Sequence, residues 1–217
     1  ICTSTDQVVV TVIPSPTILI SPPSSEICAG SNLTLTASGG TSYLWNPTGA
    51  TTSEITITPY SNSSYSVIGT SLNGCKGIAS VDVVVKPIPQ NVNAGTDASI
   101  ALCQTYQLQG SATSSSGGNL IYQWTPATGL SNPNIANPVF TPSSSGSMTF
   151  TLTVTDNNSC SVTDQVIINT ATALNTTISG QSNIICFGTS TGSATVSANG
   201  GTLPYSYSWN TSPIQTT

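Results

Sequence analysis

Apolar residues alternate with threonine or serine in short runs along the chain, for example over residues 33–37, 55–58 and 150–154. A period of two places successive side chains on opposite faces of a β-strand, so that one face is buried and the other meets water. Threonine suits the wet face because it is both β-branched and polar. Clusters of turn-forming residues such as Ser38-Gly39-Gly40 separate the runs, and no stretch has apolar residues at helical spacing. The pattern predicts an all-β chain of antiparallel β-sandwich domains.

Charged side chains are scarce. The chain has two lysines, no arginine, no histidine and seven acidic residues, so that 4% of its residues are charged, against about 25% in a typical soluble domain. A chain with a pI near 4.1, two lysines and no arginine cannot neutralise a phosphate backbone, which excludes nucleic-acid binding. No apolar run approaches the roughly 18 residues of a membrane-spanning helix, so we expect no membrane span. Because histidine is absent and no serine has the signature of a triad or dyad, we expect no enzyme activity and no cofactor.

Three landmarks recur in the same order along the chain. The first is a cysteine just before a strand, the second is an aromatic-x-Trp triplet, and the third is a cysteine in a predicted hairpin turn. The early cysteines are Cys28, Cys103 and Cys186, the tryptophans are Trp45, Trp124 and Trp209, and the turn cysteines are Cys2, Cys75 and Cys160. The turn cysteines are 73 and then 85 residues apart, which is the size of a whole small β-sandwich and exceeds a solenoid repeat.

This period predicts four segments. Residues 1–13 are expected to be the last strand of a sandwich that precedes them, because Thr-Asp-Gln-Val begins three residues after Cys2 and again three residues after Cys160. Residues 14–87 and 88–170 are expected to be complete sandwiches, and residues 171–217 the opening strands of a third. The junctions are short and proline-stiffened, which favours domains stacked end to end. Without an initiating methionine, the chain is expected to be an excerpt of a longer protein.

The motifs resemble those of a known group of repeats. Residues 28–85 carry Cys-x-Gly, Gly-Gly-x-x-Tyr-x-Trp-x-Pro, Tyr-x-Val, Asn-Gly-Cys and a valine-rich strand, an order similar to the Ig-like and PKD-like repeats of giant surface proteins of Bacteroidota. Residues 88–170 are the most PKD-like, although Thr125-Pro126-Ala127 stands where PKD domains usually have Gly-Asp-Gly. The segment from Cys186-Phe187-Gly188 to Trp209 resembles the SprB-type repeat of gliding-motility adhesins. The resemblance implies the stalk of a cell-surface adhesin exported by the type IX secretion system.

Six cysteines in a chain without histidine or a Cys-x-x-Cys spacing predict disulfides made in an oxidising compartment rather than a zinc site. The preferred pair, Cys28 with Cys160, joins neighbouring domains and leaves Cys2, Cys75, Cys103 and Cys186 for domains that are incomplete or outside the chain. A second arrangement pairs Cys28 with Cys75 and Cys103 with Cys160 within domains, and a third pairs Cys75 with Cys103 along the linker. The second is disfavoured because Cys28 precedes one strand and Cys75 follows another that runs in the same direction, which separates their sulfurs by some 40 Å at about 3.3 Å per residue.

Two further sets of residues are candidate sites. Trp45, Trp124 and Trp209 recur once per domain at one position, which favours the core tryptophan of a β-sandwich over a platform that stacks on sugars. Asp97, Asp156 and Asp164 are weak calcium candidates, because hard cations require several carboxylate and carbonyl oxygens. Their spread over about 70 residues favours solvated turn carboxylates.

Together these observations predict a structural role. The chain is expected to be a rigid, disulfide-tied spacer in an extracellular adhesin stalk or cell-surface filament. Its expected partners are the neighbouring repeats of the same chain, with other copies in a filament and a surface polysaccharide as further partners. Two alternatives stay open: a carbohydrate-binding module that uses exposed tyrosine and tryptophan, and a fibre or sheath subunit that self-assembles through uncharged threonine-rich faces.

Overall fold

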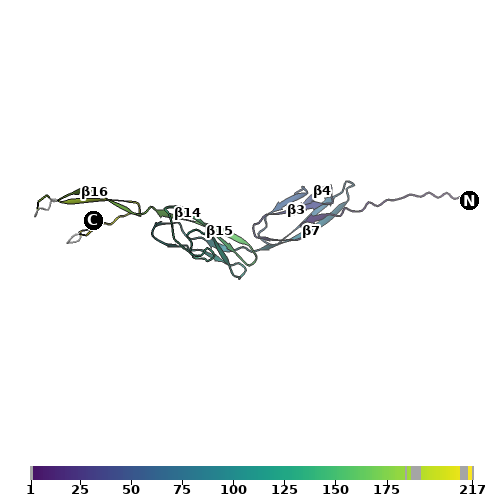
Figure 1. The fold of residues 1–217 in the computed structure, drawn as a ribbon. Coiled ribbons are helices and arrows are strands. Elements are labelled where there is room, and N and C mark those ends of the chain that lie inside the picture. The colour runs from purple at the N-terminus through teal and green to yellow at the C-terminus, as the bar shows by residue number, and fades with distance from the viewer. Residues whose placement is uncertain (1, 184, 187–191, 211–214, 217) are drawn as a thin grey trace. The chain divides into compact units, whose positions relative to one another are not determined.

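The computed structural model describes residues 2–183, 185–186, 192–210 and 215–216, and these contain strands and turns but no helix (Figure 1). The all-β class predicted from the alternation is therefore confirmed. The chain divides into two units, Ile1–Ile88 and Pro89–Thr217, so the break lies one residue beyond the expected boundary. Nowhere in the described part of the chain is there a helix long and apolar enough to cross a membrane.

The first unit contains a sandwich of two sheets, with strand orders β1-β3-β5 and β2-β7-β6-β4. All neighbours are antiparallel except β2, which runs parallel to the end of β7. Figure 1 labels β3 and β4 on the two sheets. The strands are β1 (Leu19–Ser21), β2 (Ser25–Cys28), β3 (Leu33–Ser38), β4 (Ser42–Asn46), β5 (Glu54–Ile57), β6 (Ser63–Thr70) and β7 (Lys76–Lys86).

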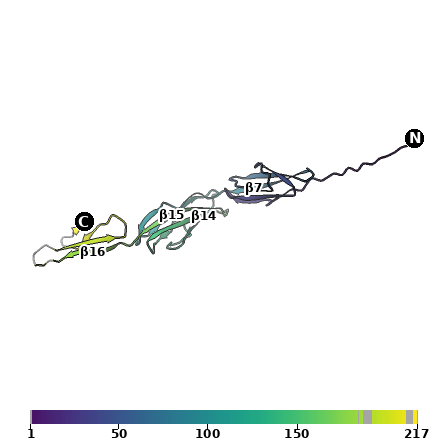
Figure 2. The same cartoon turned by 90° about the horizontal axis from the view of Figure 1, so that it is seen from above.

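The second unit begins with a sandwich of the same kind. Its main sheet has the order β12-β14-β15-β9, and β9 runs parallel to the end of β15. The facing strands form two short pairs, β8 with β11 and β10 with β13. Figure 2 shows the long strands β14 and β15 beside each other. The strands are β8 (Gln90–Asn93), β9 (Ala98–Ala101), β10 (Tyr106–Gln107), β11 (Ser111–Thr113), β12 (Ile121–Thr125), β13 (Val139–Phe140), β14 (Gly146–Thr155) and β15 (Ser161–Ala171).

Each sandwich encloses its own core, and the alternation in the sequence determines which side chains enter it. On β14, Phe150, Leu152 and Val154 are fully buried, whereas the threonines between them lie on the other face. The ring of Phe150 meets that of Phe140 edge to face, with centroids 4.9 Å apart. In the first sandwich, Leu35 on β3 is buried in the same way between exposed threonines. Both cores are thus built from strands of period two.

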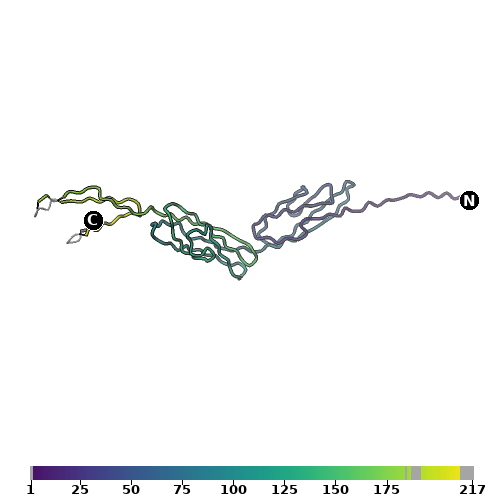
Figure 3. The backbone as a smooth tube through the Cα atoms, in the orientation of Figure 1, coloured from purple at the N-terminus to yellow at the C-terminus, as the bar shows by residue number. Residues whose placement is uncertain are grey.

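Two parts of the chain lie outside the sandwiches. Residues 2–13 form no strand, and Figure 3 shows them as a trace apart from the strands of the first unit. Residues after 171 form the hairpin of β16 (Asn175–Ser182) with β17 (Ser193–Asn199) and the short pair of β18 (Ser208–Trp209) with β19 (Gln215–Thr216). Every residue of β16 is exposed, so this hairpin encloses no core of its own among the described residues.

One ion pair joins the parallel strands of the first sandwich. Lys86 Nζ on β7 lies 2.7 Å from Glu26 Oε2 on β2, and its hydrogen bond and charge lower the pKa of Glu26 below the ordinary value of 4.5. A carboxyl group with a lowered folded-state pKa stabilises the fold above its unfolded pKa, and this contribution is lost as the pH falls through the folded pKa.

We therefore expect the side-chain carboxyl of Glu26 to titrate below pH 4.5 in the folded chain. Replacing Lys86 by methionine keeps the length of the side chain and should raise the titration midpoint. Carbon-detected NMR of the carboxyl group measures both midpoints. A midpoint that is the same with and without the Lys86 ammonium would contradict the assignment of the pKa shift.

Candidate functional site

Cys75 and Cys160 occupy the same position in two turns of the same design. Each ends the loop between the last two long strands of its sandwich. In the first loop, Ser71 N donates to Cys75 O at 2.9 Å and Gly74 N donates to Ser71 O at 2.9 Å. In the second, Asp156 N donates to Cys160 O at 3.0 Å and Ser159 N donates to Asp156 O at 3.1 Å. The residue before each cysteine has a positive φ, 79° at Gly74 and 64° at Ser159.

Both turn cysteines lie at the end of their sandwich where the chain enters. Cys75 Sγ is 3.9 Å from Ile13 O, just before the first sandwich begins. In the second sandwich, Ala94 N donates to Asp164 Oδ2 at 2.8 Å, which places the first residues of that sandwich beside the beginning of β15. Cys160 directly precedes β15 and is completely buried.

Cys28 lies at the opposite end of the first sandwich. It is the last residue of β2 and stands opposite Lys86, the last residue of β7, and Ala29 N donates to Lys86 O at 2.9 Å. In the second sandwich, Ala101 is the equivalent residue, because it stands opposite Ala171 at the end of β15. Cys103 follows two residues later in an exposed turn. Cys28 and Cys103 therefore lie where the chain leaves each sandwich.

The oxidation states of the cysteines follow these positions. Cys28 and Cys160 are in the disulfide state, whereas Cys2, Cys75 and Cys103 are free thiols. The pairs Cys28–Cys75 and Cys103–Cys160 are therefore not formed. The reason is distance: the 11 residues of β7 separate the level of Cys75 from that of Cys28, about 36 Å at 3.3 Å per residue, and a disulfide tolerates less than about 7 Å between Cα atoms. Cys186 is exposed, and Phe187 and Gly188 of its motif lie outside the described residues.

Two of the three tryptophans lie in the cores. Trp45 and Trp124 are each 1% exposed. The indole N–H of Trp45 donates to Thr52 O at 3.0 Å, and that of Trp124 to Ile135 O at 3.1 Å. Neither ring can stack on a sugar, because neither face reaches solvent. Trp209 differs from them: it is half-buried and lines a pocket of about 280 Å³ with Tyr207.

The three candidate calcium aspartates bind backbone N–H groups at separate places. Asp97 Oδ1 accepts from Ile167 N at 2.8 Å, and Asp164 Oδ2 accepts from Ala94 N. These two bonds tie the segment between β8 and β9 to β15. Asp156 Oδ1 accepts from Cys160 N at 3.0 Å and from Asn158 N at 2.9 Å, so this buried carboxylate shapes the turn that holds Cys160. Its Oδ2 is buried without a hydrogen-bond partner in the described part of the chain. The described residues contain no group of three or more acidic or cysteine side chains that could hold a metal ion.

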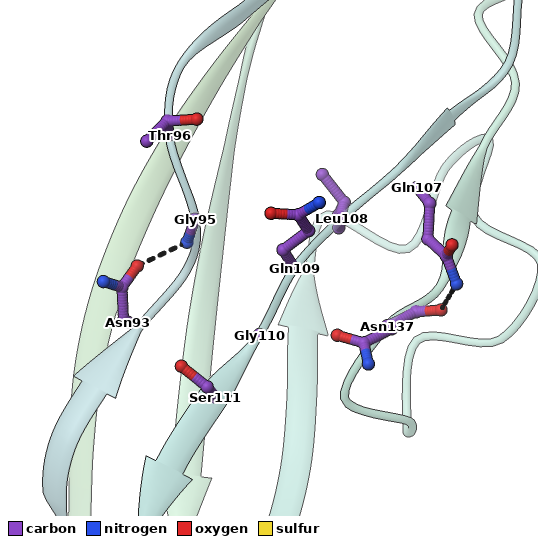
Figure 4. Close-up of a pocket in the computed structure, with 9 residues that line it drawn as sticks. All are labelled: Asn93, Gly95, Thr96, Gln107, Leu108, Gln109, Gly110, Ser111 and Asn137. Atoms are coloured by element: carbon purple, nitrogen blue, oxygen red, sulfur yellow. Dashed lines mark hydrogen bonds between the residues drawn. The ribbon is translucent and has the colours of Figure 1, made fainter.

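An open groove lies on the second sandwich (Figure 4). Its volume is about 580 Å³, and residues 107–111, which connect β10 to β11, line it together with Asn93, Thr96 and Asn137. Gln107 Nε2 donates to Asn137 O at 3.4 Å, and Gly95 N donates to Asn93 Oδ1 at 2.6 Å. None of the nine lining residues is aromatic or charged. No sequence signal identifies this groove, since glutamine and serine at alternate positions are typical of any solvent-facing side of a strand.

Two protein-family models match parts of the chain. Residues 94–170 match the PKD domain of the K319L-like type, and residues 178–213 match the SprB repeat. No curated protein sequence matches the chain.

Several solved structures align with parts of this chain. The PKD domain of the KIAA 1837 protein is 27% identical, and the match covers 43% of this chain and 93% of that one with a TM-score of 0.33. The N-terminal eight Ig domains of Down Syndrome Cell Adhesion Molecule are 12% identical over 89% of this chain and 33% of that one, with a TM-score of 0.42. The fibronectin(III)-like modules of Clostridium thermocellum CbhA are 12% identical over 71% and 94%, with a TM-score of 0.33. The chain is thus similar to tandem PKD-like repeats in its second sandwich and to an SprB-type repeat in its C-terminal segment.

Proposed function

We propose that this chain is a structural spacer in the stalk of an extracellular adhesin, tied across its domain junction by a disulfide between Cys28 and Cys160. The observation that carries the proposal is the position of the two oxidised cysteines. One lies where the chain leaves the first sandwich and the other where it enters the second. The matches to the PKD domain and the SprB repeat support the extracellular, adhesin-type context. The SprB-type segment favours a gliding-motility adhesin exported by type IX secretion.

The short linker makes this pair feasible. Cys28 stands opposite Lys86, and the next strand begins at Gln90, so only Pro87, Ile88 and Pro89 separate the two sandwiches. Four peptide units span at most about 14 Å. The turn that carries Cys160 belongs to the end of the second sandwich that this linker enters. Within their own sandwiches, Cys28 and Cys160 therefore lie at the ends that the linker joins, whereas Cys75 and Cys103 belong to the far ends.

Such a disulfide acts on the junction rather than on either core. It closes a loop of about 130 residues, and the loop-entropy model assigns this up to about 4–5 kcal/mol of stabilisation. Prolines at both ends of the linker restrict its backbone further. In this proposal the partners of the spacer are the neighbouring repeats of the same chain. Its function is to transmit force between these repeats while the junction between its two sandwiches stays closed.

A single protease cut tests the pair. The chain has two lysines and no arginine, and Lys86 precedes a proline, which trypsin does not cleave, so trypsin cuts the denatured chain only after Lys76. We expect the fragments 1–76 and 77–217 to stay linked when the chain is alkylated and digested without reductant, and to separate on reduction. Non-reducing gel electrophoresis with mass spectrometry of the linked species measures this.

Cysteine variants distinguish the proposed pair from the linker pair Cys75–Cys103, which would also join the two fragments. Cys28→Ser and Cys160→Ser should each release the fragments without reductant. Cys75→Ser and Cys103→Ser are the matched controls and should leave them linked. The proposal is wrong if the unmodified chain separates without reductant, or if Cys75→Ser separates it.

The carbohydrate-binding alternative loses two of its three tryptophans, because Trp45 and Trp124 are enclosed. The groove of Figure 4 offers amide and hydroxyl groups but no ring on which a sugar could stack. The geometry therefore favours the structural role over this alternative.

A further inference from the structure

The segment before the first sandwich carries apolar side chains that the described structure leaves exposed. Val8, Val10 and Val12 are 79–88% exposed and belong to no strand. A run of β-branched residues in water is unusual, because such side chains gain stability when they pack in a sheet. The sandwiches themselves show where equivalent residues lie.

The last strand of each sandwich follows its turn cysteine in a constant register. In the second sandwich, the residues six and eight positions after Cys160 are Val166 and Ile168, and they are 1% and 0% exposed. In the first, the residues six and eight positions after Cys75 are Val81 and Val83, at 2% and 1%. Counting from Cys2, the same two positions are Val8 and Val10.

Two further features of the segment match these last strands. Thr5-Asp6-Gln7-Val8 repeats residues 163–166 of β15, where Asp164 accepts the N–H of Ala94 at the beginning of its sandwich. Pro14 is twelve positions after Cys2, and Pro87 is twelve positions after Cys75. Both prolines open a Pro-x-Pro linker to the next sandwich.

We propose that residues 5–12 are the last strand of a further β-sandwich, which lies before the first one in the same polypeptide. In that sandwich, the strand pairs antiparallel with an edge strand whose N–H and C=O groups are otherwise unpaired. Val8, Val10 and Val12 then pack into the apolar core of that sandwich. Val9 and Thr11 face the solvent, as Ile167 and Asn169 do on β15. Asp6 accepts a backbone N–H from the opening segment of that sandwich, in the role that Asp164 has in its own.

The extent of the proposed strand pairing can be judged from the hydrogen-bonded pairs that the final strands of the two described sandwiches form. The final strand pairs with its antiparallel neighbour over ten residue pairs in the second sandwich and eight in the first. A sandwich without its final strand exposes that whole ladder and its core. Such a strand edge readily binds an extended segment. The inference depends on fold alone and not on the proposed spacer function.

Hydrogen exchange tests the proposal in the longer native polypeptide that includes the preceding sequence. The amides of residues 7–12 should exchange slowly there, with protection on the order of 100-fold or more over the 217-residue chain, because buried ladder amides open only through larger unfolding events. Equal, fast exchange in both chains would overturn the proposal. A preceding sequence without alternating strand patterns would overturn it as well.

Substitutions provide the directional test. In the longer polypeptide, Val8→Lys with Val10→Lys places two charges in the proposed core and should lower the Tm of the preceding sandwich by about 10 °C or more, or abolish its transition. Val9→Lys is the matched control on the opposite face and should leave that Tm within about 2 °C. An equal effect of both changes would refute the assigned faces. If the double variant does not fold, the exchange measurement on the unmodified polypeptide still decides.

Discussion

Replacing Trp124 by alanine is expected to lower the free energy of unfolding of the second sandwich by about 3–5 kcal/mol. The side chain is 1% exposed and packs in the cluster that contains Leu152 and Phe150. Its removal leaves a cavity that the β-sheet cannot fill without moving strands. It also leaves the carbonyl groups of Ile135 and Ala136 without the indole N–H that they accept at 3.1 and 3.2 Å.

Urea unfolding followed by far-UV circular dichroism measures the loss, and calorimetry identifies the sandwich concerned. Because Trp45 and Trp124 belong to separate core clusters, Trp124→Ala should move only the transition of the second sandwich. Ile121→Ala is the matched control: it lies on the same strand, is 65% exposed, and should change stability by less than about 0.5 kcal/mol. A loss below about 1 kcal/mol for Trp124→Ala would show that the tryptophan is not a core residue.

The tryptophans show why the local part of this fold can be predicted. On β12, Tyr122 and Trp124 are the positions that turn inward, and the alternation alone identifies them. Turn chemistry is local as well, since Asn73-Gly74 predicts a turn and the structure has one with a positive φ at Gly74. Strands and hairpin turns could therefore be predicted from neighbouring residues.

The aspartates show which contacts could not be predicted from neighbouring residues in the sequence. Asp97 and Asp164 each bind a backbone N–H group 70 positions away along the chain. The parallel contacts of β2 with β7 and of β9 with β15 also join segments that are far apart in sequence. From sequence, the aspartates were candidates for calcium or for solvated turns. Their observed role depends on tertiary contacts, which a single sequence does not specify.

The position of the cysteines depends both on local sequence patterns and on tertiary contacts. The sequence places each cysteine before or after a strand, and strand length then shows that Cys28 and Cys75 are too far apart to pair. The domain boundary could also be predicted from the sequence, but the sequence does not show that Cys28 stands beside the last residue of the first sandwich, because that depends on the parallel pairing of Cys28 with Lys86. The register of β2 on β7 is therefore the structural fact on which the proposed pair depends.

Pulling the oxidised chain by its two ends is expected to release far less length than pulling the reduced chain. With Cys28 bonded to Cys160, force passes through the disulfide, and the residues between them are excluded from the extension. These are about 130 residues, and at 3.3–3.6 Å each they hide roughly 430–470 Å of contour length. Most of both sandwiches lies inside this loop, with only β1, β2 and β15 outside it, so neither sandwich can be drawn out to its full length while the bond is intact.

Single-molecule force spectroscopy with and without reductant measures the hidden length. The variant Cys28→Ser should extend like the reduced chain under both conditions, and the control Cys75→Ser should extend like the unmodified chain. The lengths of the unfolding steps also distinguish a spacer held by its cores from one held by the disulfide. A spacer that depended on its cores alone would lengthen by a whole sandwich when the weaker one unfolds, whereas a disulfide across the junction limits the lengthening to the segments outside the loop. Equal extension of the oxidised and reduced chains would show that the junction is not tied, and that any mechanical resistance comes from the sandwiches themselves.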